Sequence, residues 1–408
     1  MKESKNNIRM YRYRIYPSQE QRKRLDSQLA SCKELYNLLL QKCKEDYKEK
    51  SISVNRKMLY KLAKQFTDND ERYSDVHSQV LQNVADRLVK SYKNYFRRIK
   101  EKKSGKKIKV GFPRFKKFYS SITYPQSGFN LAANRLFASR IGNIPIVTER
   151  LPQGKTKTLT IRRKPSGKWF VFFSSFVDTP ETENTVKYNK IGIDMGIENF
   201  ATLSDGTTIE NPRFLRKSED TLAKYQRRVS RKAKGSNRIK AKIKVARIHE
   251  KITNQRTDFL HKTSKMLTEK YSFIAVEKLN VSNMVKNHNL AKSISDASWN
   301  QFTRMIGYKA SSAGCQLVFV NPRNTSQICS GCGNTVKKEL SDRWHECDLC
   351  GLSLHRDHNS ALEILDKATD GLSGSNAFGD SVRPSVKKVV VDESGTTRVE
   401  IDAGNPAL

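Results

Sequence analysis

The chain has 408 residues, enough for two or three domains, and it carries 77 Lys and Arg against 41 Asp and Glu. The formal net charge of +36 argues against an enzyme of small metabolites and favours a polyphosphate partner, because each neutralised phosphate releases counterions. The alternative is a ribosome-associated or merely soluble basic protein, and such proteins also usually sit on nucleic acid.

No apolar run approaches the roughly 20 residues that cross a bilayer, so no membrane partner is expected. The N-terminal stretch MKESKNNIRMYRYRIYPS lacks the apolar core of a signal peptide. We therefore expect a cytoplasmic protein, in which thiols stay reduced.

The first half of the chain predicts a small β-barrel with a helical insertion. Residues 8–16 alternate like a strand with one solvated face. A helical pattern begins at Ser18, where Gln21 completes a capping pair, and continues with two breaks to about Lys103. Strand patterns return over 120–177, where a KPSG turn joins two strands into a hairpin.

Residues 87–117 hold fourteen Lys or Arg and one acid, with five aromatic residues interleaved. One interpretation is a solvated helix face whose aromatic rings lie in the core. The basic side chains of these 31 residues, with a net charge of +13, would repel one another unless a polyanion neutralised them. The pattern therefore favours a surface that follows phosphates.

The second half predicts alternating strands and helices after a polar linker at 178–189. Residues 190–203 indicate two strands, followed by a hairpin turn at Asp205-Gly206. Residues 216–262, with sixteen basic and four acidic residues, predict two antiparallel helices. Further elements follow in order: a buried strand within 271–280, a helix over 299–313, a strand within 314–322, a helix starting near Asp357, and a tail at 369–408 that is expected to be disordered.

Four of the seven cysteines form two CxxC pairs, Cys329, Cys332, Cys347 and Cys350. Each pair places two thiolates on one tight turn, and two turns complete a tetrahedron around Zn²⁺. A thioredoxin-type redox pair would instead predict a single CxxC in a βαβ unit. We expect one structural zinc ion, with no ligand position left for His355, Asp357 or His358. The remaining cysteines lie in apolar contexts and are expected in the core: Cys32, Cys43 and Cys315.

Asp194 and Glu277 both interrupt apolar strands, where an unpaired carboxylate is costly to bury. A Lys or Arg partner could account for either acid taken alone. Together with Asp357 at a helix start, they have the layout of an RNase H-like nuclease. In such a site clustered carboxylates hold two Mg²⁺ ions against their mutual repulsion.

The chain resembles the TnpB family, RNA-guided DNA endonucleases of bacterial insertion sequences that are regarded as ancestral to type V CRISPR effectors. The similar stretches run in order from about residue 8 to 366 and include GFPRFKK, GIDMGIENFATLSDG, VEKLNVSNM, NPRNTSQICSGCG and HRDHNSALEIL. Asp194, Glu277 and Asp357 match the family's catalytic RuvC motifs. Gln82 matches a position that faces the DNA motif next to the target. At His355 the chain departs from the family's third catalytic motif, in which an acid is common at this position.

The resemblance implies a multidomain α+β fold with a β-barrel, an RNase H-like (RuvC) α/β nuclease and an inserted zinc ribbon. The implied parts are a barrel at 1–17 and 118–180, a helical recognition insertion at 18–117, a nuclease domain at 181–322 and 355–368, and a target-binding zinc ribbon at 323–354.

The resemblance also implies an Mg²⁺-dependent endonuclease that cuts double-stranded DNA next to a short transposon-adjacent motif, directed by a guide RNA from the element end. The expected particle is one protein chain with one RNA, associated with the bacterial nucleoid. A nuclease-silent, RNA-guided repressor would need a broken acidic triad. A guide-free RuvC-like nuclease would not need the helical insertion, and a non-enzymatic zinc-ribbon RNA-binding protein would keep every activity after Asp194→Ala.

Overall fold

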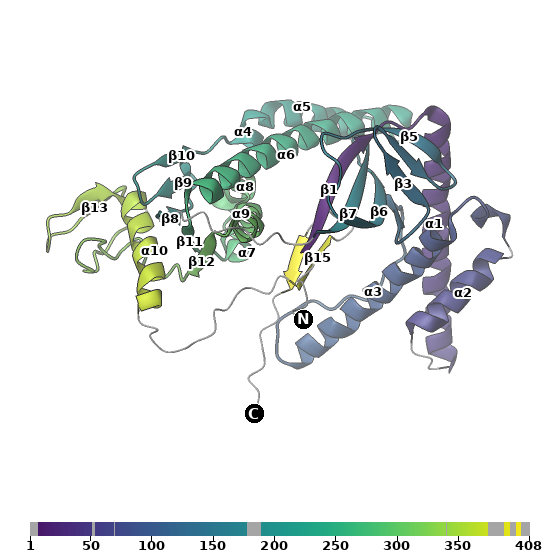
Figure 1. The fold of residues 1–408 in the computed structure, drawn as a ribbon, viewed down its shortest axis with the longest axis horizontal. Helices are drawn as coiled ribbons and strands as arrows, with labels where there is room; N and C mark the ends of the chain where they lie inside the picture. Colours follow the sequence, from purple (N-terminus) through teal and green to yellow (C-terminus); the bar gives the residue numbers. More distant parts are fainter. Residues whose placement is uncertain are drawn as a thin grey trace. The chain divides into compact units, whose positions relative to one another are not determined.

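The computed structural model describes residues 7–50, 54–68, 70–177, 189–339, 341–373, 387–391 and 397–400. The chain divides into two compact units, one formed by Met1–Asp178 with Pro384–Leu408 and the other by Thr179–Arg383 (Figure 1). Within the described ranges, no helix is both long and apolar enough to cross a membrane.

The first unit contains a nearly closed, antiparallel sheet of seven strands in the order β2-β6-β7-β1-β5-β4-β3. The N-terminal strand pairs with both β5 and β7, so the sheet combines a segment near residue 8 with segments after residue 120, as predicted for the barrel. Its strands are β1 (Asn7–Ile15), β2 (Ser121–Tyr124), β3 (Phe129–Ala132), β4 (Arg135–Ala138), β5 (Gly142–Val147), β6 (Lys155–Arg163) and β7 (Trp169–Val177).

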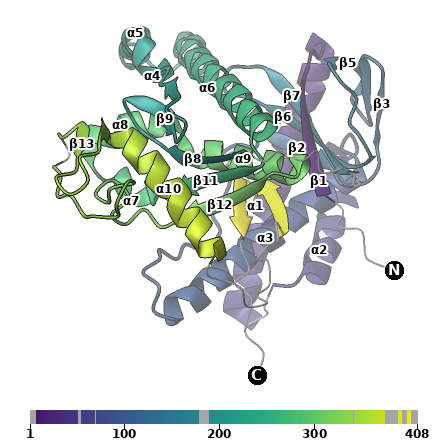
Figure 2. The same cartoon turned by 60° about the vertical axis from the view of Figure 1, so that its left-hand side comes forward.

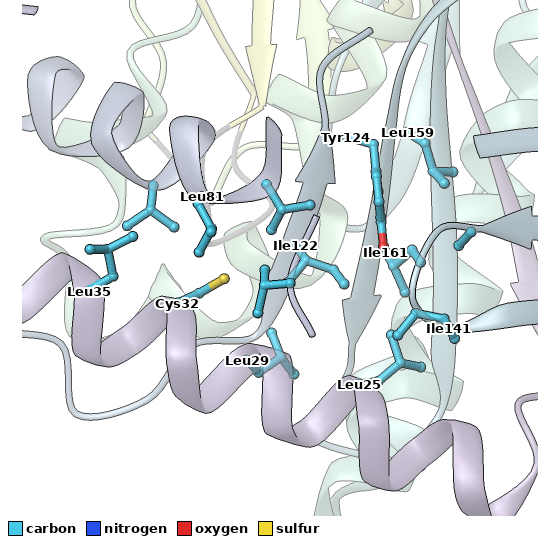
Figure 3. Packing of buried hydrophobic residues seen from close by; sticks show 14 of the residues in the cluster. Leu25, Leu29, Cys32, Leu35, Leu81, Ile122, Tyr124, Ile141, Leu159 and Ile161 are labelled. Atoms are coloured by element: carbon cyan, nitrogen blue, oxygen red, sulfur yellow. The ribbon is translucent and has the colours of Figure 1, made fainter. Parts of the chain in front are cut away.

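Helices occupy the segment between β1 and β2, as the sequence predicts: α1 (Gln19–Lys50), α2 (Arg56–Asp68), the short 3₁₀ helix η1 (Glu71–Tyr73) and α3 (Ser78–Lys103). The predicted cap of α1 is present. The Ser18 amide donates to Gln21 Oε1 at 3.0 Å, and the Gln21 amide donates to Ser18 Oγ at 3.2 Å. Figure 3 shows how one face of α1 packs against the sheet, with Leu25 and Leu29 beside Ile122 and Ile161.

The second unit is built on a five-stranded sheet in the order β10-β9-β8-β11-β12. Strands β8, β9 and β10 form an antiparallel meander, whereas β8, β11 and β12 run parallel. The strands are β8 (Lys190–Asp194), β9 (Asn199–Leu203), β10 (Thr208–Glu210), β11 (Phe273–Glu277) and β12 (Gln316–Val320). The predicted Asp205-Gly206 turn connects β9 to β10, with Gly206 at a φ of 82°.

Helices cover both faces of this sheet (Figure 2). Ile191 and Ile193 of β8 pack with buried residues of α6, α8 and α9 on one face, and Phe273 and Ala275 of β11 pack with α10 on the other. The helices are α4 (Phe214–Lys217), α5 (Glu219–Ser230), α6 (Ser236–Lys270), α7 (Val281–Met284), α8 (His288–Ala297), α9 (Trp299–Ala313) and α10 (Arg356–Ser373).

Two regions differ from or extend the sequence prediction. Helix α8 is not predicted by the sequence patterns, although Asn287 caps it by accepting from the Asn289 amide. In the tail expected to be disordered, the structure describes the end of α10 and a hairpin of β15 (Lys387–Val391) with β16 (Thr397–Glu400). The rest of that tail, and most of the predicted linker at 178–189, lies outside the described residues.

Candidate active site and cysteine cluster

Asp194 and Glu277 end two neighbouring strands of the five-stranded sheet. Strands β8 and β11 are parallel, and Ile193 pairs with Val276 immediately before the two acids. Because the carboxyl ends of parallel strands meet at one edge of a sheet, the register places the acids side by side. The alternation of side chains along each strand puts them on the face covered by α10, together with Gly192 and Ala275.

Glu277 is 8% exposed and is held by a hydroxyl group. Thr325 Oγ1 donates a hydrogen bond to Glu277 Oε1. Burial raises the pKa of Glu277, although the bond from Thr325 and the charge of Lys367 act in the opposite direction. The positive charge of Lys367 therefore does not fully compensate for the burial of the Glu277 carboxylate.

Asp357 reaches the same place from the first turn of α10. The helix approaches β8 closely because position 192 has no side chain: a Cβ on Gly192 would lie 2.1 Å from the carbonyl oxygen of Ala361. Close to β8, a Cβ on Gly196 would lie 3.9 Å from Asp357 Oδ2. The absence of a side chain at Gly192 thus allows α10 to pack closely against β8.

The pKa of Asp194 reports an electrostatic interaction with the other two acids. Burial raises the pKa of Asp194 well above its usual value, and the charges of Glu277 and Asp357 raise it further, while Arg356 opposes them. Among the described residues, only the four cysteines form a group of three or more metal-binding side chains whose ligand atoms all lie within 4.8 Å of one another. The three carboxylates are therefore spaced more widely than the ligands of a single ion.

The two histidines of the HRDHN stretch have structural contacts. His355 Nδ1 accepts a hydrogen bond from the Asp357 amide at 3.3 Å, so its ring caps the start of α10. His358 Nε2 lies 3.3 Å from the carbonyl oxygen of Ser204, where it joins α10 to the β9–β10 turn. Neither contact involves the cysteine cluster.

The four predicted cysteines lie together, with every sulfur atom within 4.8 Å of the others. Cys329 Sγ is 3.7 Å from Cys350 Sγ, and Cys332 Sγ is 3.6 Å from Cys347 Sγ. A regular tetrahedron with metal–sulfur bonds of about 2.3 Å has edges of about 3.8 Å. The sulfur positions therefore fit a four-coordinate zinc ion. The other three cysteines are buried, as expected.

Two polar residues beside these groups were missed by sequence reasoning. Asn359 is fully buried and bonds to the turn between Cys329 and Cys332, and Thr325 is 3% exposed and holds Glu277. The sequence offered only a weak signal, namely a neutral polar side chain two positions after Asp357 and another four positions before Cys329.

In the first unit, Gln82 lies exposed on α3, so its side chain is accessible to a ligand. Its neighbour Gln79 has a structural task, because Gln79 Oε1 accepts from the Ser127 amide at 2.9 Å. The recognition role of Gln82 stays a prediction.

The basic stretch 87–117 exposes most of its aromatic rings. Tyr92 is buried, which agrees with the core interpretation for that residue. Four phenylalanines in or next to the stretch are between 42 and 78% exposed: Phe96, Phe112, Phe115 and Phe118. Lys44 Nζ lies 4.5 Å from the centre of the Phe115 ring. The surface therefore combines cations with accessible rings, as single-stranded nucleic-acid sites do.

Comparison with protein families gives three consecutive matches along the chain. The model OrfB_IS605, described as "Probable transposase", matches residues 174–288, and a Cas12f1-like TNB domain matches residues 299–364. A helix-turn-helix domain model matches residues 7–51. In the structure, the described part of residues 7–51 forms β1 followed by the single long helix α1.

Whole-length relatives give the clearest result. The chain is 36% identical over 388 residues to a candidate RNA-guided DNA endonuclease of Streptomyces pristinaespiralis, covering 92% of both chains. It is 30% identical to InsQ of Escherichia coli (strain K12), which carries the same description, over 88% of this chain and 92% of that one. The solved mini-RNA-guided endonuclease CRISPR-Cas_phi3 is 10% identical, covers 89% of this chain and 92% of its own, and has a TM-score of 0.47. The chain belongs to the OrfB_IS605/TnpB family.

Proposed function

We propose that this protein is an RNA-guided, Mg²⁺-dependent endonuclease that cuts double-stranded DNA next to a short transposon-adjacent motif. The observation that carries the proposal is that Asp194 and Glu277 end two paired parallel strands, while Asp357 approaches them from the first turn of α10. The 36% identity to a relative described as an RNA-guided DNA endonuclease supports the same activity.

The topology of the second unit supports an RNase H-like, RuvC-type nuclease. An antiparallel meander of three strands is followed by two parallel strands, and a late helix crosses the face that carries the acids. This arrangement brings acids from distant parts of the sequence to one edge. We assign the nuclease domain to residues 181–322 and 355–368, with the zinc ribbon at 323–354 between its two segments.

The donor set fits Mg²⁺, because three carboxylates supply hard oxygen ligands and their repulsion would be relieved by divalent cations. Bound there, two such ions would activate a water molecule and stabilise the leaving 3′ oxygen. Asp194 and Glu277 present their oxygens from fixed strand ends, and Asp357 presents its oxygens from a helix start. Thr325 fixes the orientation of the Glu277 carboxylate by donating to Oε1.

The cysteine cluster fits a single structural zinc ion, and four thiolates leave no open coordination position for chemistry. We assign the first unit to RNA and target recognition, with the barrel at 1–17 and 118–180 and the helical insertion at 18–117. The net charge of +36 and the exposed rings beside α3 support a guide RNA as partner.

The proposal is tested by purifying the full chain with RNA transcribed from the end of its genetic element and sequencing the RNA that copurifies. A plasmid that carries a sequence matching the guide beside randomised flanking DNA should then be cut in the presence of Mg²⁺. Purification free of RNA, or equal cutting of an unmatched plasmid, would contradict RNA guidance. Binding to the matched plasmid without cutting would instead identify a nuclease-silent repressor.

A further inference from the structure

Asn359 connects α10 to the first cysteine turn and uses both ends of its amide. Its Oδ1 accepts from the Ser330 amide at 3.0 Å, and its Nδ2 donates to the carbonyl oxygen of Ile328 at 2.8 Å. The side chain is fully buried. A buried amide with both groups bonded fixes the distance and the orientation between two segments, because loss of either bond leaves a buried polar group unpaired.

Asn359 and Asp357 act on different sides of the same helix. Residues two apart on an α-helix are separated by about 200° around its axis. Asp357 therefore faces the acids while Asn359 faces the turn formed by Cys329 and Cys332. The cysteine turn thus holds α10 at the level of its first turn, where the acid is placed.

A second bond links the same module to another acid. Thr325 is 3% exposed, and its hydroxyl donates to Glu277 Oε1. Thr325 precedes Cys329 by four residues, and between them Ile328 pairs with Thr335 in a β-bridge. The segment that leads into the cysteine turn is therefore itself anchored.

We propose that the zinc-binding turn and the segment leading into it position the nuclease site, with Asn359 setting the place of Asp357 and Thr325 setting that of Glu277. This inference rests on the proposed function. It assigns the ribbon a task within the acid cluster in addition to any contact it makes with nucleic acid. Asn359 and Thr325 are positioning residues, since each acts through a carboxylate.

The amide of Asn359 suits this positioning role because it accepts one hydrogen bond and donates another. An aspartate at this position would lose the donor to Ile328 and would place a carboxylate oxygen against a carbonyl oxygen. Outer partners of metal ligands typically change metal affinity by about 10- to 100-fold when they are removed. We therefore expect the affinity of the acid cluster for a divalent ion to report on both bonds.

The test measures Mn²⁺ binding to the full-length protein by electron paramagnetic resonance. The binding measured for the Asp194→Asn variant is subtracted, because it represents ions held elsewhere on the protein or by RNA. Asn359→Ala and Thr325→Val should each weaken the Asp194-dependent binding by about tenfold or more. Both should keep one zinc per chain by elemental analysis. The matched control is Asn334→Ala, which removes an exposed asparagine of the same module and should leave Mn²⁺ affinity unchanged.

Wild-type Mn²⁺ affinity in both Asn359→Ala and Thr325→Val would overturn the inference and leave the proposed function intact. Equal weakening in Asn334→Ala would also overturn it. Absence of Asp194-dependent binding in the wild-type protein would instead refute the nuclease site itself. If Asn359→Ala fails to fold or loses zinc, Thr325→Val decides, because Thr325 belongs to the segment that leads into the cysteine turn, while its hydroxyl contacts Glu277 and no cysteine.

Discussion

Asp194 is placed where a carboxylate is costly without a cation. It is buried, and two further acids add like charge, so its pKa lies well above the usual value. A group in this situation destabilises the metal-free fold at neutral pH and gains most from a divalent ion. Functional sites often carry such a cost.

Replacing this charge should stabilise the metal-free protein. We expect Asp194→Asn to raise the Tm of the second unit in EDTA, by about 2–4 °C for each kcal/mol regained in a unit of this size. Addition of Mg²⁺ should raise the Tm of the wild type and leave that of the variant unchanged. Calorimetry checks both, and Asp366→Asn, which changes an exposed acid on α10, is the control. A lower Tm for Asp194→Asn in EDTA would argue against the repulsion.

The same acid predicts a pH dependence of defined sign. Because the folded state raises the pKa of Asp194, the neutral acid contributes stability that is complete below its unfolded pKa. That contribution is lost as pH rises through the folded pKa. In metal-free buffer the advantage of Asp194→Asn in unfolding free energy should therefore grow as the pH rises above about 4, the ordinary value for aspartate, and level off above the folded pKa, with a slope of at most about 1.4 kcal/mol per pH unit. Urea denaturation at several pH values measures it, and a constant difference would contradict it.

The sequence reveals the acids but not the residues that hold them. Asp194 and Glu277 stand out because a charge interrupts an apolar strand, and Asp357 because it starts a helix after the cysteines. Asn359 and Thr325 carry no charge, and their burial depends on where the cysteine turn packs. That packing is a long-range property, which one sequence does not encode in a local pattern.

At the scale of elements, the close packing of α10 against β8 depends on Gly192. A Cβ on Gly192 would meet the Ala361 carbonyl oxygen at 2.1 Å, so the helix must shift to accept it. We expect Gly192→Ala to cost about 1–3 kcal/mol of stability and to reduce cleavage by moving Asp357. Thermal unfolding and a Mg²⁺-dependent cleavage assay measure the two effects.

The matched control for this substitution is Gly307→Ala in α9. A Cβ there would lie 3.7 Å from Leu317 Cδ2, an ordinary contact, and alanine favours a helix. This variant should retain full cleavage and equal or greater stability. Equal behaviour of the two variants would mean that the close approach of α10 is unimportant.

Elements with strong periodicity were predictable, and one with a weak pattern was not. Helix α9 agrees with the prediction of a helix over 299–313, because its apolar residues recur at helical spacing. Helix α8 was missed because only Ile294 and Ala297 of its ten residues are buried. Its Asn287 cap was the signal that could have found it.

At the scale of the whole molecule, the charge of +36 favours a polyanionic partner, and the exposed rings are the side chains on which the bases of the proposed guide RNA would stack. The ring of Phe115 is 48% exposed, with the Lys44 ammonium 4.5 Å from its centre. We expect Phe115→Ala to weaken guide RNA binding by about 1–3 kcal/mol at constant salt, with little change in Tm. Filter binding measures the loss.

Phe319→Ala is the control for this substitution, since Phe319 is 49% exposed on β12 and lies in the second unit, outside the parts assigned to RNA recognition. Its RNA affinity should equal that of the wild type. An equal loss in both variants would indicate a general effect of surface phenylalanines, and no loss in Phe115→Ala would exclude stacking at this ring.

The most direct test of the central claim is guide-programmed plasmid cleavage by the wild type and by Asp357→Asn, each purified with the same guide RNA. We predict that the wild type cuts both strands of the matched plasmid only when Mg²⁺ is present. The variant should bind the guide and retain its zinc, yet fail to cut either strand. Cleavage by Asp357→Asn at the wild-type rate would contradict the assignment of Asp194, Glu277 and Asp357 as the nuclease site.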